Sequence, residues 1–125
     1  MPFEYHLVPN AENGRFDEEA MDSMRAFLDQ FPHCIWQDGA YVLFRTDDDR
    51  DRRVPKLLAQ QGNSYLDPIV SVQPDSVFIS SVADPATDKY LHGFVTYCQA
   101  RWPCDLWYGT EQVSPDDLLM QPGEA

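Results

Sequence analysis

Residues 84–109 read DPATDKYLHGFVTYCQARWPCDLWYG and hold a well-formed helix signal followed by a strand signal. This stretch opens with Asp84 and Pro85, the pattern of an N-cap residue followed by a proline in the first helical position. Because apolar residues then recur at three- and four-residue steps, we expect a helix over residues 85–102, ended by Pro103, and a strand over residues 105–109. The apolar positions of that helix are Leu91, Phe94, Val95, Cys98 and Trp102.

The N-terminal part of the chain repeats this order of elements. Residues 3–8 alternate apolar and polar side chains like a half-buried strand, and Asp17 is placed to cap a helix that ends near Phe31. The junction that follows, FPHCIW at 31–36, shares its aromatic residue, proline, aliphatic residue and tryptophan with WPCDLW at 102–107. Proline after a helix is common enough that coincidence explains the match equally well.

The middle of the chain holds two predicted hairpins and a long connection. The first hairpin covers residues 34–45 and turns at Asp38-Gly39, a strong type I′ signal. The second covers residues 69–82 and turns at Pro74-Asp75. Between them we expect residues 46–68 to form a solvated loop with one short helix over 55–61.

These elements predict one α+β domain over residues 1–120, followed by a frayed tail at 121–125. We expect a mainly antiparallel sheet of about six strands with two long helices on one face. The order β-α-β-β-β-β-α-β resembles a ferredoxin-like arrangement with an added hairpin. A pseudo-twofold sheet built from two β-α-β units, 3–37 and 76–109, is the alternative.

The chain is strongly acidic, with a net charge of -12 from 21 acidic and 9 basic residues. Residues 45–56 hold four of the acidic and five of the basic residues, so the rest of the chain carries 17 acidic against 4 basic. This balance argues against direct binding to nucleic acid or to an anionic membrane, and a basic protein is the natural partner. The alternative is that the acidic surface only keeps the protein soluble.

The sequence contains no recognisable catalytic motif, and we predict neither an enzyme nor a cofactor. Neighbouring strand residues point to opposite faces, so His33 and Cys34 cannot easily share a proton. The three cysteines form no CxxC pair and are expected to be reduced thiols. With no signal peptide and no apolar run of membrane-spanning length, we expect a cytoplasmic protein.

The run Asp47-Asp48-Asp49-Arg50-Asp51 invites a metal-binding interpretation, because hard cations bind carboxylate oxygens. Its spacing does not match a calcium loop, since no later bidentate glutamate follows at the required distance. A solvated loop with self-compensating charges is the simpler explanation, and we predict no metal site.

The leading functional hypothesis is an acidic protein-binding inhibitor, most simply an immunity protein that neutralises a basic toxin or effector. Aromatic residues would anchor the partner and acidic residues would attract it. A small-ligand-binding or regulatory domain, with Trp36 or Trp107 lining an apolar pocket, is the first alternative, and a nucleic-acid-mimic inhibitor and an enzyme with a dispersed site are others. The candidate partner-binding residues are Asp22, Asp29, Trp36, Asp47, Asp48, Asp49, Tyr97 and Trp107.

Overall fold

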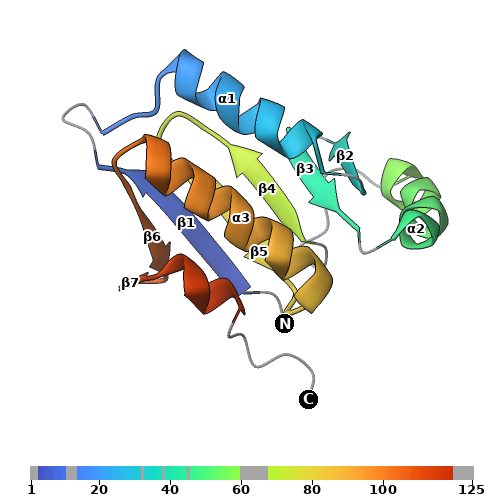
Figure 1. Ribbon diagram of the computed structural model, residues 1–125. Helices are drawn as coiled ribbons and strands as arrows, with labels where there is room; N and C mark the ends of the chain where they lie inside the picture. Colours follow the sequence, from blue (N-terminus) through green and yellow to red (C-terminus); the bar gives the residue numbers. More distant parts are fainter. Residues whose placement is uncertain are drawn as a thin grey trace.

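The computed structural model describes residues 3–10, 14–31, 33–37, 39–44, 46–59 and 68–119. The expected frayed tail and the turn residue Asp38 lie outside these ranges. The strands in the described part of the chain are Phe3–Pro9 (β1), Cys34–Gln37 (β2), Ala40–Leu43 (β3), Ile69–Val72 (β4), Val77–Ser81 (β5), Cys104–Tyr108 (β6) and Glu111–Val113 (β7). They form one antiparallel sheet in the order β2-β3-β4-β5-β1-β6-β7 (Figure 1).

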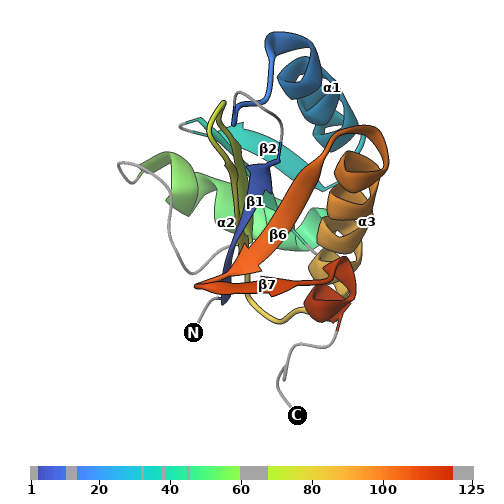
Figure 2. The same cartoon turned by 90° about the vertical axis from the view of Figure 1, so that its left-hand side faces the viewer.

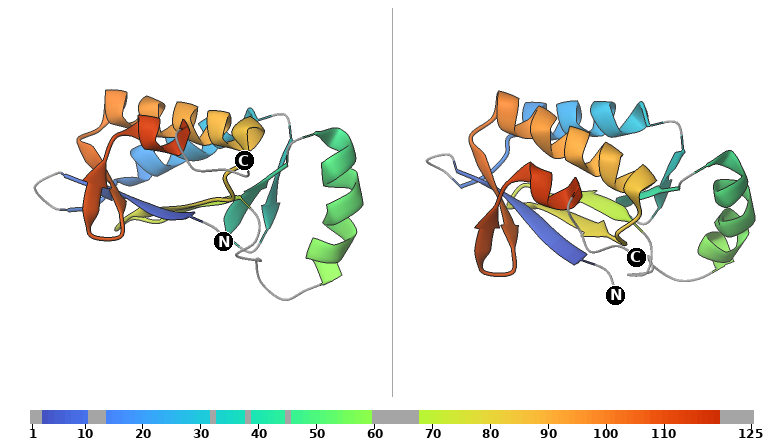
Figure 3. Two further views of the ribbon diagram at one scale, coloured as in Figure 1. Left: turned by 90° about the horizontal axis from the view of Figure 1, so that it is seen from below. Right: turned by 60° about the horizontal axis from the view of Figure 1, so that its bottom comes forward.

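Helices α1 (Glu18–Asp29) and α3 (Pro85–Arg101) lie side by side on one face of this sheet, which we call the helix face (Figures 1 and 3). Each begins where the sequence predicts. The Asp17 carboxylate accepts a hydrogen bond from the Ala20 amide at 2.8 Å, and the Asp84 carboxylate accepts one from the Ala86 amide at 3.1 Å. Both bonds satisfy amides of the first helical turn, which have no partner within the helix. The predicted α+β class with two long helices on one face is confirmed.

The sheet topology favours the ferredoxin-like alternative. Strand β1 pairs antiparallel with both β5 and β6, so β5 and β6 run parallel to each other and are joined by α3. Strands β1 and β2 are likewise joined by α1, but β5, β4 and β3 stand between them. The two β-α-β units therefore occupy unequal places in the sheet. If β3 and β4 are set aside, the remaining strands up to β6 lie in the order β2-β5-β1-β6. This is the strand order of a ferredoxin-like fold.

The main core fills the space between the helix face and the two long helices. Alternate strand residues such as Tyr5 and Leu7 point into it and are fully buried. The helices contribute the apolar stripes that the sequence predicts, including Met24 and Leu28 from α1 and Phe94 from α3. A smaller core cluster lies on the opposite face of the sheet, and its members are Ala40, Val42, Phe44 and Ile69, with Ile35, Val54 and Phe78 packed against them.

Helix α2 (Asp47–Ala59) corrects the expectation of a solvated loop. The aspartate run is helical from its first residue, whereas the short helix was expected to begin only at Pro55. Thr46 caps it, since its hydroxyl accepts a hydrogen bond from the Asp49 amide at 3.0 Å. Figures 2 and 3 show α2 on the other side of the sheet from α1 and α3, where Val54 packs into the smaller cluster.

The C-terminal part adds a strand that the sequence analysis did not predict. After β6 the chain turns at Gly109, whose φ of 63° suits glycine, and returns as β7 beside it. The expected C-terminal turn is the 3-10 helix η1 (Pro115–Leu119), which begins after Ser114. Of the helices described here, none is long and apolar enough to cross a membrane.

Candidate protein-interaction surface

The outward side of α1 carries an acidic stripe. Between residues 17 and 29 the sequence has five acidic side chains and one basic side chain, Arg25, whose guanidinium lies 3.4 Å from the Asp22 carboxylate. All five acidic residues are exposed, because the apolar residues of α1 face the sheet. Two of the predicted partner-binding residues belong to this stripe. Its members are Asp17, Glu18, Glu19, Asp22 and Asp29.

Trp36 is an exposed aromatic side chain on the edge strand β2. Its exposed fraction is 54%, and its ring meets the ring of Tyr41 edge-on at a centroid distance of 4.9 Å. It lies two residues after Cys34, which packs against the main core, so it points to the helix face of the sheet. A half-exposed tryptophan held by a second aromatic ring is a rigid apolar contact point.

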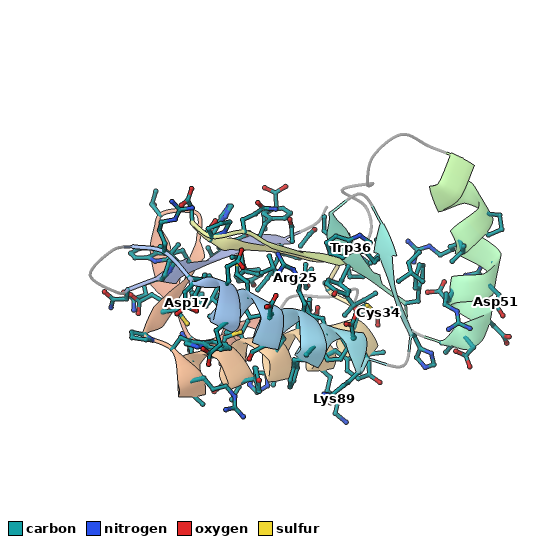
Figure 4. All side chains as sticks on the ribbon, turned by 90° about the horizontal axis from the view of Figure 1, so that it is seen from above. Asp17, Arg25, Cys34, Trp36, Asp51 and Lys89 are labelled. Atoms are coloured by element: carbon teal, nitrogen blue, oxygen red, sulfur yellow. The ribbon has the colours of Figure 1, made fainter. Side chains whose placement is uncertain are left out.

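Asp29 joins the acidic stripe to these aromatic residues. Burial raises the pKa of Tyr41 to about 12, and a hydrogen bond to the Asp29 carboxylate adds to the shift. Burial also raises the pKa of Cys34 to about 12, and the charge of Asp29 contributes again. Asp29 therefore lies against both β2 and β3. Figure 4 shows Arg25 of α1 and Trp36 of β2 in the same region.

We call this area the α1–β2 surface, formed by Asp22, Arg25, Asp29 and Trp36, with the buried Tyr41 ring packed beneath Trp36. Three of the predicted site residues meet here, namely Asp22, Asp29 and Trp36. Tyr41 was not among the candidate partner-binding residues selected from the sequence. A tyrosine five residues after a tryptophan, across a two-residue hairpin turn, was the available signal, because such residues face each other on one side of the sheet.

The three aspartates of α2 do not act alike. Asp48 is exposed, and Asp47 is largely exposed while its carboxylate lies 2.9 Å from the His33 ring and 3.4 Å from Arg50. Asp49 is buried, and its carboxylate pairs with Arg52 at 2.9 Å and with Arg53 at 3.4 Å. These ion pairs hold α2 together. Asp49 is therefore engaged in ion pairs within α2, and its predicted role in partner binding stays a prediction.

Tyr97 contributes to the packing of α1 on α3. Its ring stacks on Phe27 of α1 at 4.4 Å and meets Trp102 at 5.9 Å. The Arg101 guanidinium lies over the same ring, 4.3 Å from its centroid. These contacts cover much of the side chain, so its first role is to fix the two helices against each other.

Trp107 lies on the opposite face of the sheet from Trp36. Its neighbours in β6, Cys104 and Leu106, are both in the main core, and Trp107 alternates with Leu106. It stands between His6 of β1 and Gln112 of β7 in the strand register. The two tryptophans selected from the sequence therefore cannot contact one partner surface together.

A buried polar cluster lies where β5 meets α3, and no sequence pattern predicted it. The Ser81 hydroxyl donates to the Asp88 carboxylate at 2.6 Å and accepts from the Ala83 amide at 3.1 Å. Burial raises the pKa of Asp88 to about 6, the nearby charge of Asp84 adds to the rise, and the Ser81 hydrogen bond opposes it. Since Asp88 and Ser81 are closed to solvent, this cluster is structural.

The described cysteine thiols are poorly suited to act as nucleophiles. Cys34, Cys98 and Cys104 are free, and burial raises the pKa of each thiol, so the reactive thiolate is scarce at neutral pH. His33 and His92 each lie 2.9 Å from an aspartate, Asp47 and Asp116 respectively. Within the described ranges, no group of three or more histidine, cysteine, aspartate and glutamate residues is placed to hold a metal ion.

A cavity of about 220 Å³ lies at one end of the helix layer, and neither Trp36 nor Trp107 contributes to it. Its lining residues are Pro9, Arg15, Phe16, Asp17, Ala20, Trp102 and Pro103.

Comparison of the chain with protein-family models, with curated proteins and with solved structures gives no match.

Proposed function

We propose that this protein is a cytoplasmic, protein-binding inhibitor that neutralises a basic partner, in the manner of an immunity protein directed at a toxin or effector. One observation carries the proposal. Trp36, with 54% of its surface exposed, packs on Tyr41, and the Asp29 carboxylate at the end of the exposed acidic stripe of α1 lies close enough to Tyr41 to raise its pKa. An apolar anchor surrounded by carboxylates is the chemistry that recognises a basic protein surface.

The two halves of the α1–β2 surface have different tasks. The acidic stripe belongs to a chain with a net charge of -12, and such a field speeds the encounter with a basic protein. It contributes less to holding the complex, because exposed ion pairs are weak. Trp36 supplies an apolar contact from which water is displaced when the partner binds. Tryptophan is among the residues that dominate measured binding energies.

Two properties would identify the partner, namely the charge of its surface and the position of its gene. We expect a stoichiometric protein with a basic surface, encoded beside the gene for this chain. A complex captured from native lysate, purified by size exclusion and identified by mass spectrometry tests both expectations. A neutral or acidic partner, or a gene placed among metabolic genes, would count against the inhibitor hypothesis.

Paired charge-reversal variants locate the binding surface. Asp22→Lys/Asp29→Lys removes two carboxylates of the α1–β2 surface. Glu4→Lys/Glu111→Lys makes the same change in net charge at exposed positions on β1 and β7. We expect the first variant to weaken the captured complex at least tenfold more than the control, because local charge complementarity adds to the general field. Equal weakening by both variants would mean that the α1–β2 surface is not the site.

A further inference from the structure

The outer side of β2 exposes backbone groups that have no ladder partner among the described strands. The Phe44 amide donates to the His33 carbonyl at 2.8 Å, which makes this a hydrogen-bonded pair of the β2–β3 ladder. Such pairs alternate with non-hydrogen-bonded pairs along an antiparallel ladder. Cys34 and Trp36, opposite Leu43 and Tyr41, therefore direct their N–H and C=O groups away from β3.

This edge lacks the side chains that usually prevent strand addition. Natural edge strands are protected by short length and by lysine, proline, other charged side chains or bulges. The four residues of β2 are Cys-Ile-Trp-Gln, with no charge and no proline. The other edge of the sheet, β7, has only three residues and begins with Glu111. Of the two edges, only β2 offers an added strand uncharged side chains and an exposed tryptophan.

Carboxylates stand at both sides of this edge. Asp29 of α1 is close enough to Cys34 and Tyr41 to raise their pKa values. Asp47 of α2 bonds His33, the residue immediately before β2. Arg50 pairs with Asp47 at 3.4 Å, and Arg25 lies near Tyr41. The preference of this edge for lysine or arginine over acidic side chains therefore comes from Asp29 together with the net charge of -12.

We infer that the outer edge of β2 accepts an extended, basic segment of the partner protein as an added strand. Backbone hydrogen bonds to Cys34 and Trp36 supply the register, the Trp36 ring packs on an alternate side chain, and Asp29 together with the net negative charge selects basic residues. This inference rests on the proposed function, for which it specifies the mode of binding.

Three synthetic octapeptides test the inference on the intact chain. The first alternates lysine and valine, the second has the same sequence with alternate backbone amides N-methylated, and the third replaces lysine by glutamate. We expect saturable binding of the first by calorimetry, at least tenfold weaker binding of the second, and none of the third. Amide exchange at Cys34 and Trp36 should slow at least tenfold with the first peptide, while Ile35, already bonded to β3, changes little.

Two matched variants complete this test. Trp36→Lys places a charge on the edge and should abolish binding of the lysine peptide. Leu119→Lys makes the same change at an apolar residue of nearly equal exposure, 53%, on η1, and should leave binding intact. Binding that survives N-methylation or Trp36→Lys overturns the inference. A concentration-dependent dimer that Trp36→Lys dissociates also overturns it, since the occupant would then be a second copy of the chain.

The outcome for the edge and the outcome for the proposed function are separable. If the captured basic partner stays bound to Trp36→Lys but is lost from Asp22→Lys/Asp29→Lys, strand addition is wrong and the inhibitor function stands. If the lysine peptide adds to β2 as described and no basic protein forms a complex, the edge inference is supported and the proposed function fails.

Discussion

Replacing Asp88 by asparagine gives the most quantitative prediction. Asp88 is 3% exposed, and burial raises its pKa from 3.8 to about 6, with Asp84 adding to the rise. The ionised form is thus disfavoured in the folded protein. Below about pH 3.8 the Asp88 carboxyl is protonated in both the folded and the unfolded protein, so its raised pKa does not lower the free energy of unfolding. Above about pH 6 it is charged in both states, and the shift corresponds to about 3 kcal/mol lost from the free energy of unfolding.

The groups that face Asp88 come from several elements. Ser81 of β5 donates the 2.6 Å hydrogen bond, and Asp84 caps the same helix. Burial raises the pKa of Tyr5 of β1, and the negative charges of Asp117 and Asp88 both add to the rise. The Tyr5 hydroxyl also donates a hydrogen bond to the Asp117 carboxylate at 2.9 Å. Asparagine keeps an oxygen that can accept the Ser81 bond and removes the charge. Relative to wild type, Asp88→Asn should therefore gain stability as pH rises from about 4 to 6, by up to about 3 kcal/mol.

Urea unfolding of both proteins from pH 3.5 to pH 8 measures this difference. The asparagine amide can add a constant offset, so the informative quantity is the change with pH. Asp48→Asn, at an exposed position on α2, is the control and should show no comparable rise. A difference that stays flat with pH, or one in which wild type gains relative stability as pH rises, would refute the account of Asp88 as a buried carboxyl that opposes folding.

Core packing, the α2 ion pairs and the net charge each give one further prediction. Leu28→Ala, at a fully buried position, should lower the free energy of unfolding by about 2 to 5 kcal/mol in urea titrations, and a loss below about 1 kcal/mol would contradict its place in the core. Asp49→Ala should cost about 1 to 3 kcal/mol, because it removes a buried carboxylate with two arginine partners, and Asp48→Ala less than about 1. Equal losses from these two variants would contradict the burial of Asp49. The association rate with the captured basic partner should fall at least tenfold from low salt to ~0.15 M, where the Debye length is ~8 Å, while dissociation changes little. A salt-independent association rate would exclude electrostatic steering.

The fold was predictable where the signals are local. Asp17 and Asp84 sit directly before their helices and bond amides two or three residues away, so sequence order is sufficient to recognise them. The apolar stripes of both long helices follow the helical period for the same reason. The order of the strands in the sheet was harder to predict from the sequence. The position of β1 between β5 and β6 depends on contacts between residues that lie 70 or more positions apart.

The N-terminal part of helix α2 was missed because its sequence has little apolar periodicity. Its signal was instead the pattern Thr46-Asp47-Asp48-Asp49, a serine or threonine followed three residues later by an acidic residue, which is typical of a helix N-terminus. The aspartate and arginine spacings of three and four residues were a second signal. Both were outweighed by the density of charge, which equally suits a solvated loop.

The candidate site could be predicted only in part. Exposed acidic residues on α1 follow from helical periodicity, and Asp22 and Asp29 were found in that way. The opposite orientations of Trp36 and Trp107 depend on which face of each strand the helices cover, and apolar residues on both faces hide that choice. The stacking of Tyr97 on Phe27 and the bond between Asp29 and Tyr41 arise only when separate elements pack together.

The two tryptophans on opposite faces of the sheet allow the most direct test of the proposed binding surface. The measurement is the dissociation rate of the captured basic partner from Trp36→Ala and from Trp107→Ala, by surface plasmon resonance at ~0.15 M salt. We predict that Trp36→Ala weakens the complex by about 2 kcal/mol or more, mainly through faster dissociation, and that Trp107→Ala leaves it unchanged. A complex that tolerates Trp36→Ala and is lost with Trp107→Ala would contradict the assignment of the α1–β2 surface.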